Sequence, residues 1–302
     1  MNFDIGEVLS RAGQITWKNK VLWLFSALPI VASFLILPAM LFPMFFLEAD
    51  SNGTPVVFEN LIFLVIFLMG TILISILSFV LYTAATSFLT VGIIRAETGE
   101  GMLPFRELLT EGMKYFVRIL GIGLLVSVSF SAIFTVISFG LVLFGIVTIG
   151  IGFICAQPLF LLMYPLMMLL YALTEQSNAA VVADDLSVTD AIAKAWNLLK
   201  ANFWRILLLS IIVYFAVSIL SSIVTLPLMM PMFFFPFLIE PSQVGQSMKI
   251  LGLVMVVFGF IFLPVMALVQ GVAITFMKSA YILTYLRLTR PAEQPVPVEA
   301  TA

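Results

Sequence analysis

Long apolar stretches alternate with short polar segments along this chain. The charge-free runs cover residues 21–47, 60–94, 119–174, 206–239 and 250–277. A bilayer core about 30 Å thick needs about 20 apolar residues per helix, so each run is long enough to cross a membrane. The run 119–174 is too long for a single span, and Gly140 and Gly145 near its middle predict that it crosses twice. The pattern therefore predicts an all-α polytopic membrane protein with six transmembrane helices.

The positive charges predict the orientation of these spans. Every Lys and Arg except Lys249 lies on one side of the six predicted spans. Short loops rich in Lys and Arg face the cytoplasm, which predicts that both the N and C termini are cytoplasmic. The composition agrees with this class of protein, because the mean hydropathy is +1.19 and only 10% of the residues are charged, against about a quarter in soluble domains.

Two parts of the chain resemble each other. The segment that starts at Asp4 aligns with the segment that starts at Ser187, and Asn19 then falls on Asn202. Further along, three residues of one part match three of the other: Thr83, Ser87 and Arg95 fall on Thr275, Ser279 and Arg287. A weaker third copy begins near residue 105. Internal similarity of this kind indicates an architecture built from repeated units.

We therefore predict three units, at about residues 1–97, 98–176 and 177–289. Each unit is a cytoplasmic amphipathic helix followed by an outward span and a returning span. Units of this kind share one orientation, so they are parallel repeats about an axis along the membrane normal. Residues 1–289 form a single transmembrane domain. Residues 290–302 are polar and rich in proline, which predicts a disordered cytoplasmic tail.

Apolar residues recur at helical spacing in two of the cytoplasmic segments. The predicted stripes are Ile5, Val8, Leu9, Ala12 and Ile15 in the first unit, and Ile192, Ala195, Trp196, Leu199 and Phe203 in the third. Such stripes predict amphipathic helices, and Ser187 is expected to cap the second one. Each helix leads into aromatic and cationic residues, which favour the headgroup layer. We expect these residues to be interfacial anchors: Trp17, Lys18, Lys20, Trp23, Trp196, Lys200, Trp204 and Arg205.

Groups that carry enzymatic chemistry are scarce. Histidine is absent, which removes the commonest general base and metal ligand. No Asp or Glu lies in a predicted span, no phosphate-binding loop or metal-ligand spacing occurs, and the single cysteine, Cys155, is expected to be a packing residue. The sequence therefore predicts a protein that is not an enzyme and needs no cofactor or metal. The formal net charge of −2 argues against a nucleic-acid partner, and membrane lipids are the expected partners.

Two features are candidates for contact with a lipid or substrate. Lys278 lies nine residues before Arg287, about 13 Å along a helix. It is either an anchor for an anionic group or a residue whose amine snorkels to the interface, and we favour snorkelling. Phe233, Phe234 and Phe235 lie among prolines that predict a break or kink near the outer leaflet. These rings either line a groove for a lipophile or form an apolar plug, and we favour the plug.

The junctions between the amphipathic helices and the spans resemble those of a known group of proteins. The segments that carry the resemblance are 181–185, 191–196 and 202–205, together with the segment from Trp17 to Lys20. They resemble a broad group of uncharacterised prokaryotic polytopic membrane proteins, which includes the membrane domain of some glycerophosphoryl diester phosphodiesterases. The resemblance covers about residues 1–290 and implies the plasma (inner) membrane of a prokaryote. It implies no catalytic residue, because that family's activity belongs to a soluble barrel of typically about 250 residues.

These observations lead to two expectations about function. The first is a non-enzymatic integral membrane protein with a structural, lipid-interacting or accessory role. The alternative is a transporter or lipid-translocating protein for a lipophilic or anionic substrate. A transporter would need a water-filled path lined by polar residues of the spans: Ser127, Ser129, Ser131, Gln157 or Gln270. The sequence identifies neither a substrate nor a protein partner.

Overall fold

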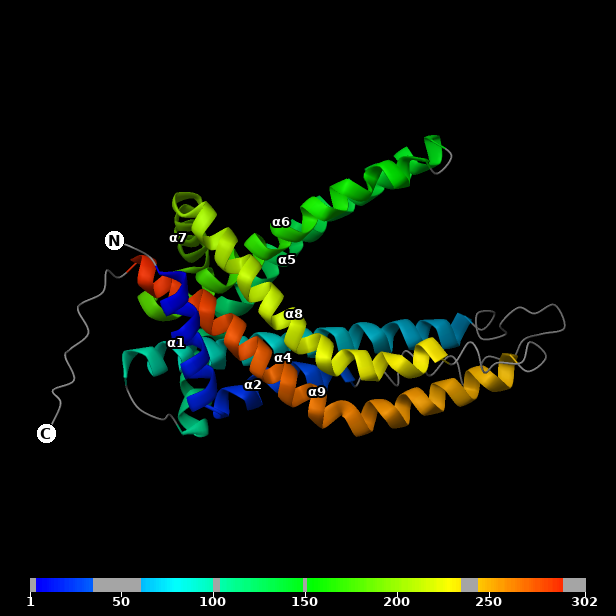
Figure 1. Ribbon diagram of the computed structural model, residues 1–302, viewed down its shortest axis with the longest axis horizontal. Coiled ribbons are helices and arrows are strands. Elements are labelled where there is room, and N and C mark those ends of the chain that lie inside the picture. Colours follow the sequence, from blue (N-terminus) through cyan, green and yellow to red (C-terminus); the bar gives the residue numbers. More distant parts are fainter. Residues whose placement is uncertain (1–3, 35–60, 100–103, 149–150, 235–243, 290–302) are drawn as a thin grey trace, which may run out of the picture.

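The computed structural model describes residues 4–34, 61–99, 104–148, 151–234 and 244–289, and all regular elements in these segments are helices (Figure 1). The helices are α1 (Ile5–Lys18), α2 (Val21–Phe34), α4 (Leu61–Thr98), α5 (Phe105–Val147), α6 (Ile151–Asp184), α7 (Val188–Ala201), α8 (Phe203–Phe234) and α9 (Val244–Thr289). The predicted all-α class is confirmed for these residues. The run 119–174 contains two helices, α5 and α6, as expected from its length.

Four of the described helices are long and apolar enough to cross a membrane. Their apolar parts are Val65–Thr98, Phe105–Val147, Phe203–Ile223 and Phe260–Thr289, which belong to α4, α5, α8 and α9. The prediction of a transmembrane protein is therefore supported by the fold. The first predicted span continues from α2 into residues 35–47, which lie outside the described residues. The number six stays a prediction.

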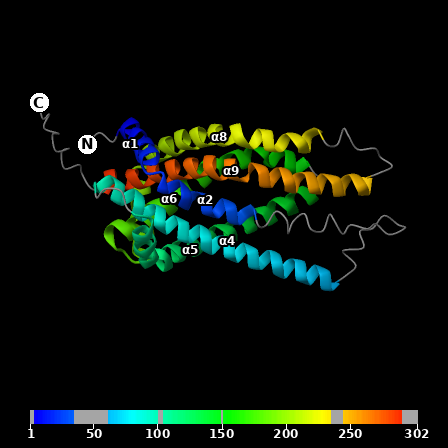
Figure 2. The same ribbon diagram turned by 90° about the horizontal axis from the view of Figure 1, so that it is seen from below.

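Three inner helices organise the packing. α4, α6 and α9 contact one another, while α2, α5 and α8 each bridge two of them. α2 packs on α9 and α4, α5 packs on α4 and α6, and α8 packs on α6 and α9 (Figure 2). Away from the end where α1 and α7 lie, the α5–α6 hairpin diverges from α4, α8 and α9 (Figure 1).

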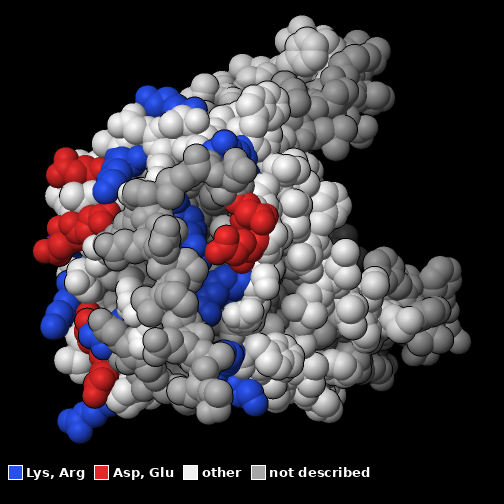
Figure 3. All heavy atoms as spheres, turned by 60° about the vertical axis from the view of Figure 1, so that its left-hand side comes forward, with Lys and Arg blue, Asp and Glu red and all other residues white. Residues whose placement is uncertain are grey.

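Charged side chains gather at one end of the molecule, where α1, α7 and the first turns of α5 lie beside the last turns of the inner helices (Figure 3). Ion pairs there join different helices: Arg11–Glu97, Arg95–Glu111, Arg118–Asp185, Lys194–Asp184, Arg287–Glu7 and Arg287–Glu97. The amphipathic segments are thereby fastened to the ends of the long helices. This is the end that the charge pattern predicts to be cytoplasmic.

The two short helices begin and end as their sequences predict. Ser187 caps α7 by accepting a hydrogen bond from the backbone N–H of Asp190, and Asp4 caps α1 in the same way through Gly6. At the other end, Asn19 and Asn202 each donate a side-chain hydrogen bond to the carbonyl four residues earlier. Both helices therefore stop at an asparagine before the next helix starts.

The buried faces of the short helices agree with the predicted stripes only in part. In α1 the predicted residues Val8, Ala12 and Ile15 are buried, so that stripe is confirmed. In α7 the buried residues are Ala191, Ala195 and Leu199, whereas Trp196 and Phe203 are exposed. The small side chains of α7 allow close contact with α6, and the bulky rings are left on the outer face.

α2 and α9 approach each other closely at small residues. A Cβ added at Gly271 would lie 2.8 Å from the carbonyl oxygen of Trp23, so a larger residue there would collide with the backbone of α2. One turn further along α9, the hydroxyls of Thr275 and Ser26 are 2.7 Å apart. These small residues therefore have a packing role, in agreement with the way small residues bring transmembrane helices together.

Of the predicted break or kink at the prolines of α8, the break is wrong as far as the structure describes that segment. α8 changes direction along its length (Figure 1), yet it stays helical through Pro227 and Pro231 and ends at Phe234. In hydrocarbon, freed backbone groups find no water, so a continuous helix is preferred to an open break. The other prolines of this prediction lie outside the described residues: Pro38, Pro43, Pro236 and Pro241.

Candidate binding site in the membrane-spanning region

A buried ion pair lies where the three inner helices meet. Nζ of Lys278 in α9 is 2.5 Å from Oε1 of Glu175 in α6, and both side chains are 1% exposed. The same amine donates a hydrogen bond of 3.2 Å to the hydroxyl of Thr86 in α4. It also lies 5.5 Å from the centre of the Tyr82 ring, within the range of a cation–π contact. One lysine therefore connects α4, α6 and α9.

The pair lies well inside the charged end of the molecule. Thr86, Glu175 and Lys278 each precede a residue of that end by nine positions, namely Arg95, Asp184 and Arg287. Nine residues of helix span about 13 Å. Removing two charges from water is costly and is repaid only by good geometry and further hydrogen bonds. Ionisable groups at such positions in membrane proteins are rare and are associated with function.

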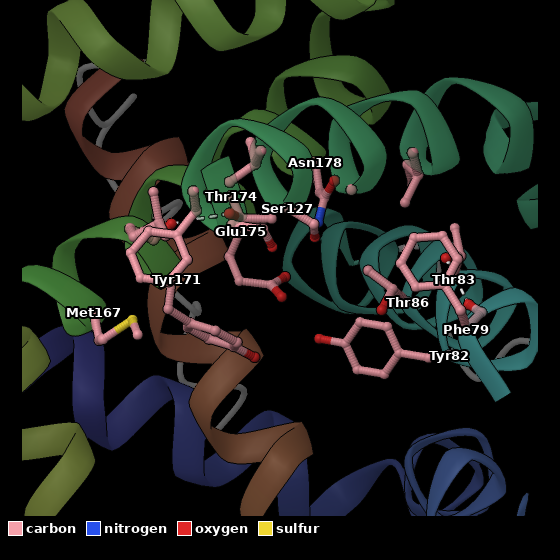
Figure 4. Close-up of a pocket in the computed structure, with 16 residues that line it drawn as sticks. Phe79, Tyr82, Thr83, Thr86, Ser127, Met167, Tyr171, Thr174, Glu175 and Asn178 are labelled. Atoms are coloured by element: carbon pink, nitrogen blue, oxygen red, sulfur yellow. Dashed lines mark hydrogen bonds between the residues drawn. The ribbon is translucent and has the colours of Figure 1, made fainter. Parts of the chain in front are cut away.

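A cavity of about 480 Å³ adjoins this pair between α4, α5 and α6 (Figure 4). Its walls are mostly apolar and aromatic, with Phe79 from α4, Phe130 from α5 and Met167 from α6. Glu175 and Asn178 lie at its polar end, where the carboxylate points towards Tyr82 and Thr86 (Figure 4). Other lining residues are exposed, among them Tyr82, Ser127 and Ser131, so the cavity reaches the surface of the protein.

Two hydrogen-bond acceptors at the polar end of the cavity have no donor bound to them. Oε2 of Glu175 and Oδ1 of Asn178 are buried and have no hydrogen-bond partner among the described residues. The Tyr171 side chain lies close to Glu175, but it does not satisfy Oε2. Buried polar atoms in proteins are nearly always paired, and an unpaired one costs about 1–3 kcal/mol. These two atoms are therefore suited to a ligand or water that donates hydrogen bonds.

A second cavity of about 310 Å³ lies along the α5–α6 hairpin. The two cavities share three lining residues, Val126, Phe130 and Leu170. The lining of the second is apolar apart from Ser129 and includes Ile192 from α7. The first cavity by itself combines a polar end with apolar walls, which is the arrangement that an amphiphilic molecule requires.

The structure gives Lys278 a different environment from the one the sequence favoured. Snorkelling is wrong, because the amine does not extend to the surface but ends on Glu175 and Thr86 inside the protein. Lys278 is not among the residues that line the cavity. Its contact with a ligand would therefore be indirect, through the carboxylate of Glu175.

The other predicted contact residues are placed less fully. Phe235 lies outside the described residues, and the side chains of Phe233 and Phe234 at the end of α8 do as well. The groove and plug interpretations therefore both stand as predictions. Of the expected anchors, Trp23 is half-buried, and its indole donates a 2.8 Å hydrogen bond to the carbonyl of Thr16. The remaining anchors are exposed: Trp17, Lys18, Lys20, Trp196, Lys200, Trp204 and Arg205.

Sequence reasoning missed Glu175, the central residue of this site. The charge-free run ends at Thr174, so the predicted span stops just before Glu175. α6 instead continues to Asp184, and Glu175 is buried with its neighbours Gln176, Ser177 and Asn178. A usable signal was available, because the nine-residue spacing from Lys278 to Arg287 also separates Glu175 from Asp184.

Gln270 behaves as a side-chain amide at depth usually does. Its oxygen accepts a hydrogen bond of 3.3 Å from Ser221, which links α9 to α8.

Among the described residues, no group of three or more His, Cys, Asp or Glu side chains is arranged to hold a metal ion. Hydrogen bonding and apolar contact are therefore the interactions that this site offers.

Comparison with known proteins adds a family but no activity. No curated protein and no solved structure matches the chain. The match to a protein family covers residues 16–294, which includes all the residues of the ion pair and both cavities. The chain belongs to this family, described as a family of unknown function (DUF7544).

Proposed function

We propose that this protein is a non-enzymatic integral membrane protein that binds an amphiphilic, lipid-like molecule between α4, α5 and α6. The observation that carries the proposal is the cavity of about 480 Å³, with apolar walls and the free oxygen of Glu175 at its polar end. Two of the three helices that form its walls, α4 and α5, are apolar enough to span a membrane. An opening on such a surface gives access to lipids from the bilayer, so membrane lipids are the first partners to consider.

The proposal includes a definite orientation in the membrane. The chain crosses six times with both termini in the cytoplasm, and the exposed Trp, Lys and Arg residues at the charged end lie in the headgroup layer. The excess of Lys and Arg at that end supports this orientation. The polar end of the cavity is then in the cytoplasmic half of the bilayer. The resemblance to prokaryotic proteins supports the plasma (inner) membrane of a prokaryote as the location.

Three parallel repeats would explain why the site lies where it does. The inner helices α4, α6 and α9 are the returning spans of the three units, and Thr86, Glu175 and Lys278 occupy corresponding positions in them. The packing pairs support this arrangement, since α2, α5 and α8 each contact the returning span of their own unit and that of a neighbour. The asparagines that end α1 and α7 support it as well. The ion pair and its partner Thr86, beside the binding site, then lie at the axis and contain one residue from each unit.

Membership of the larger group that includes phosphodiesterase membrane domains is also part of the proposal. The resemblance at the helix junctions supports a membrane part with no catalytic barrel. A ligand-binding or accessory role fits such a part better than catalysis does, because the site offers a carboxylate already neutralised by a lysine. An ion-paired carboxylate of this kind is a poor general base.

The proposal is tested by filling the cavity. Gly123 of α5 lines it, and a Cβ there would have only ordinary contact, 3.6 Å from Phe79. Gly123→Leu therefore places a side chain in the cavity without backbone collision. Gly140→Leu is a matched control on the same helix, because a Cβ at Gly140 meets nothing within 4 Å. Both changes replace a helix-interior glycine, so both favour the helix by a similar amount.

The measurement is native mass spectrometry of wild-type protein and both variants, released from their own membrane with lipids retained. We expect a bound molecule of defined mass on the wild type and on Gly140→Leu, and its loss from Gly123→Leu. Only heterogeneous bulk lipid on all three proteins, or a defined adduct unaffected by Gly123→Leu, would contradict the proposal.

A second candidate function is transport, and one observation favours it. The α5–α6 hairpin diverges from the other long helices beyond the ion pair (Figure 1), so movement of this hairpin could expose the cavity to the opposite side. Single cysteines at Ser127 and Ser131, in a Cys155→Ser background, would test this. Labelling by a membrane-impermeant thiol reagent from both sides favours transport, and protection from both sides favours a binding protein.

A further inference from the structure

From the polar end of the cavity we infer that the bound amphiphile is uncharged and has hydroxyl or amide hydrogen-bond donors in its head. The inference rests on the proposed function and narrows its ligand to one chemical class. It depends on two observations: the acceptors at the polar end lack donors, and the adjacent charges already neutralise each other.

The two unpaired acceptor atoms determine which hydrogen-bond donors the head of the ligand must have. Oε2 of Glu175 and Oδ1 of Asn178 come from the same helix, three residues apart, and so lie on one face of α6. Both residues line the cavity, and both of these buried atoms lack partners among the described residues. A head with two donors, such as a glycerol with two free hydroxyls, can pair with both. A head with no donor would leave both acceptors buried and unpaired.

A negatively charged head would find no positive partner. Nζ of Lys278 donates hydrogen bonds to Glu175 and Thr86 and lies 5.5 Å from the centre of the Tyr82 ring. The amine is also absent from the cavity lining. A carboxylate or phosphate in the cavity would instead lie against the free carboxylate oxygen of Glu175. Repulsion between like charges in a low-dielectric region is strong, so anionic lipids are disfavoured.

A positively charged head would lack a free negative partner. The charge of Glu175 is already balanced by Lys278 at 2.5 Å, so an ammonium ion would add one uncompensated charge to an apolar region. Burial of such a charge is costly. The Tyr82 face that could attract a cation is already occupied by Lys278. A neutral head with donors is the class that satisfies the acceptors without either cost.

The apolar part of the ligand has a place on the walls of the first cavity. An acyl chain that starts at the polar end can pack against Phe79, Phe130 and Met167. Together these features correspond to a monoacylglycerol-like molecule, which we use as the probe.

The test compares four probes with the same chain length and different heads. Monooleoylglycerol has donors and no charge, methyl oleate has neither donors nor charge, oleate is anionic and oleylamine is cationic. Purified full-length protein in detergent is offered all four at equal concentration, and bound probes are quantified by native mass spectrometry. We expect monooleoylglycerol to bind about tenfold or more above each of the others, the effect of a hydrogen bond to a charged acceptor.

A double variant tests the role of the carboxylate. Glu175→Leu with Lys278→Met removes acceptor and charge together and leaves no unpaired ion. We expect this variant to bind methyl oleate and monooleoylglycerol with similar affinity. The ranking in the wild type requires no variant, so it tests the inference even if the double variant does not fold.

The outcomes separate the two proposals. Binding of all four probes with similar affinity, abolished by Gly123→Leu, overturns the inference on the head and leaves the proposed function in place. Preference for oleate or oleylamine in the wild type also overturns the inference. If Gly123→Leu reduces the binding of none of the four probes, the proposed function is overturned as well.

Discussion

The ion pairs of this protein occupy two different environments. At the charged end, Arg118 and Asp185 form a pair with side chains 41% and 73% exposed. Between the inner helices, Lys278 and Glu175 are each 1% exposed. Exposed pairs contribute about 0–1 kcal/mol because water and salt screen them. Burial of the second pair has a large desolvation cost. Each of its residues then requires the other, because removal of one would leave an uncompensated charge inside the protein.

This difference indicates different roles. The pairs at the charged end each link neighbouring helices, and several exist, so loss of any one is tolerated. The buried pair joins α6 to α9 by two opposite charges, with Thr86 as its contact to α4. An apolar pair could pack there at lower cost. We therefore attribute the presence of Lys278 and Glu175 to the cavity beside them, where Glu175 keeps one oxygen free.

The largest expected effect comes from removing one partner of the buried pair. Lys278→Met leaves the Glu175 carboxylate buried without its counter-ion. We expect a loss of about 3–5 kcal/mol in the free energy of unfolding, measured by denaturant titration in mixed micelles. Lys200→Met, which removes an exposed lysine beside Trp196, is the matched control and should change stability by less than about 1 kcal/mol. Equal effects of the two variants would contradict the assignment of Lys278 to the interior.

Removing both charges should restore much of this loss. In Glu175→Leu with Lys278→Met, no ion remains buried, and apolar side chains of similar size fill the space. We expect stability within about 1–2 kcal/mol of the wild type, together with loss of the preference for donor-bearing amphiphiles. The same denaturant titration measures the first quantity. A double variant that is as unstable as Lys278→Met would show that the pair is required for folding and not for ligand binding.

The sequence predicts the two environments unequally well. Charge-free runs and the Lys and Arg distribution correctly predict a helical membrane protein with charged residues at one end, because these properties depend on composition along the chain. The small-residue stripe at Gly271 and Thr275 was also predictable, since helical spacing places both on one face. These features require no knowledge of which helices are neighbours.

The candidate site was not predictable in the same way. Its residues come from α4, α6 and α9, and sequence spacing within one helix does not indicate which groups meet across three. Lys278 stands out in the sequence as an unusual charge, but its position near the end of a long helix favours snorkelling, and the sequence does not indicate its partner on α6. Glu175 was missed because it directly follows an apolar run, where a helix extending beyond the membrane cannot be distinguished from the start of a loop.

A smaller effect is expected from the third contact of the buried amine. Thr86→Val keeps the size of the side chain and removes the acceptor that Lys278 uses at 3.2 Å. Because the bond is to a charged group and its loss leaves one N–H unpaired, we expect a loss of about 1–3 kcal/mol in unfolding free energy. Thr90→Val on the same helix is the control, since its hydroxyl bonds only to the carbonyl of Thr86. A greater effect at Thr90 would indicate general sensitivity of α4.

The smallest effect, and the sharpest contrast with the buried pair, is expected at the charged end. Arg118→Ala removes the contact with Asp185 and should cost less than about 1 kcal/mol in unfolding free energy. That cost should shrink further between about 0.05 M and 0.5 M salt, because the screening length for exposed charges falls from about 14 Å to about 4 Å over this range. The cost of Lys278→Met should change little over the same range, since ions in solution cannot approach a pair that is 1% exposed. Parallel salt dependence of the two variants would mean that water reaches Lys278 and Glu175, and the cavity would then be a hydrated path, as transport requires.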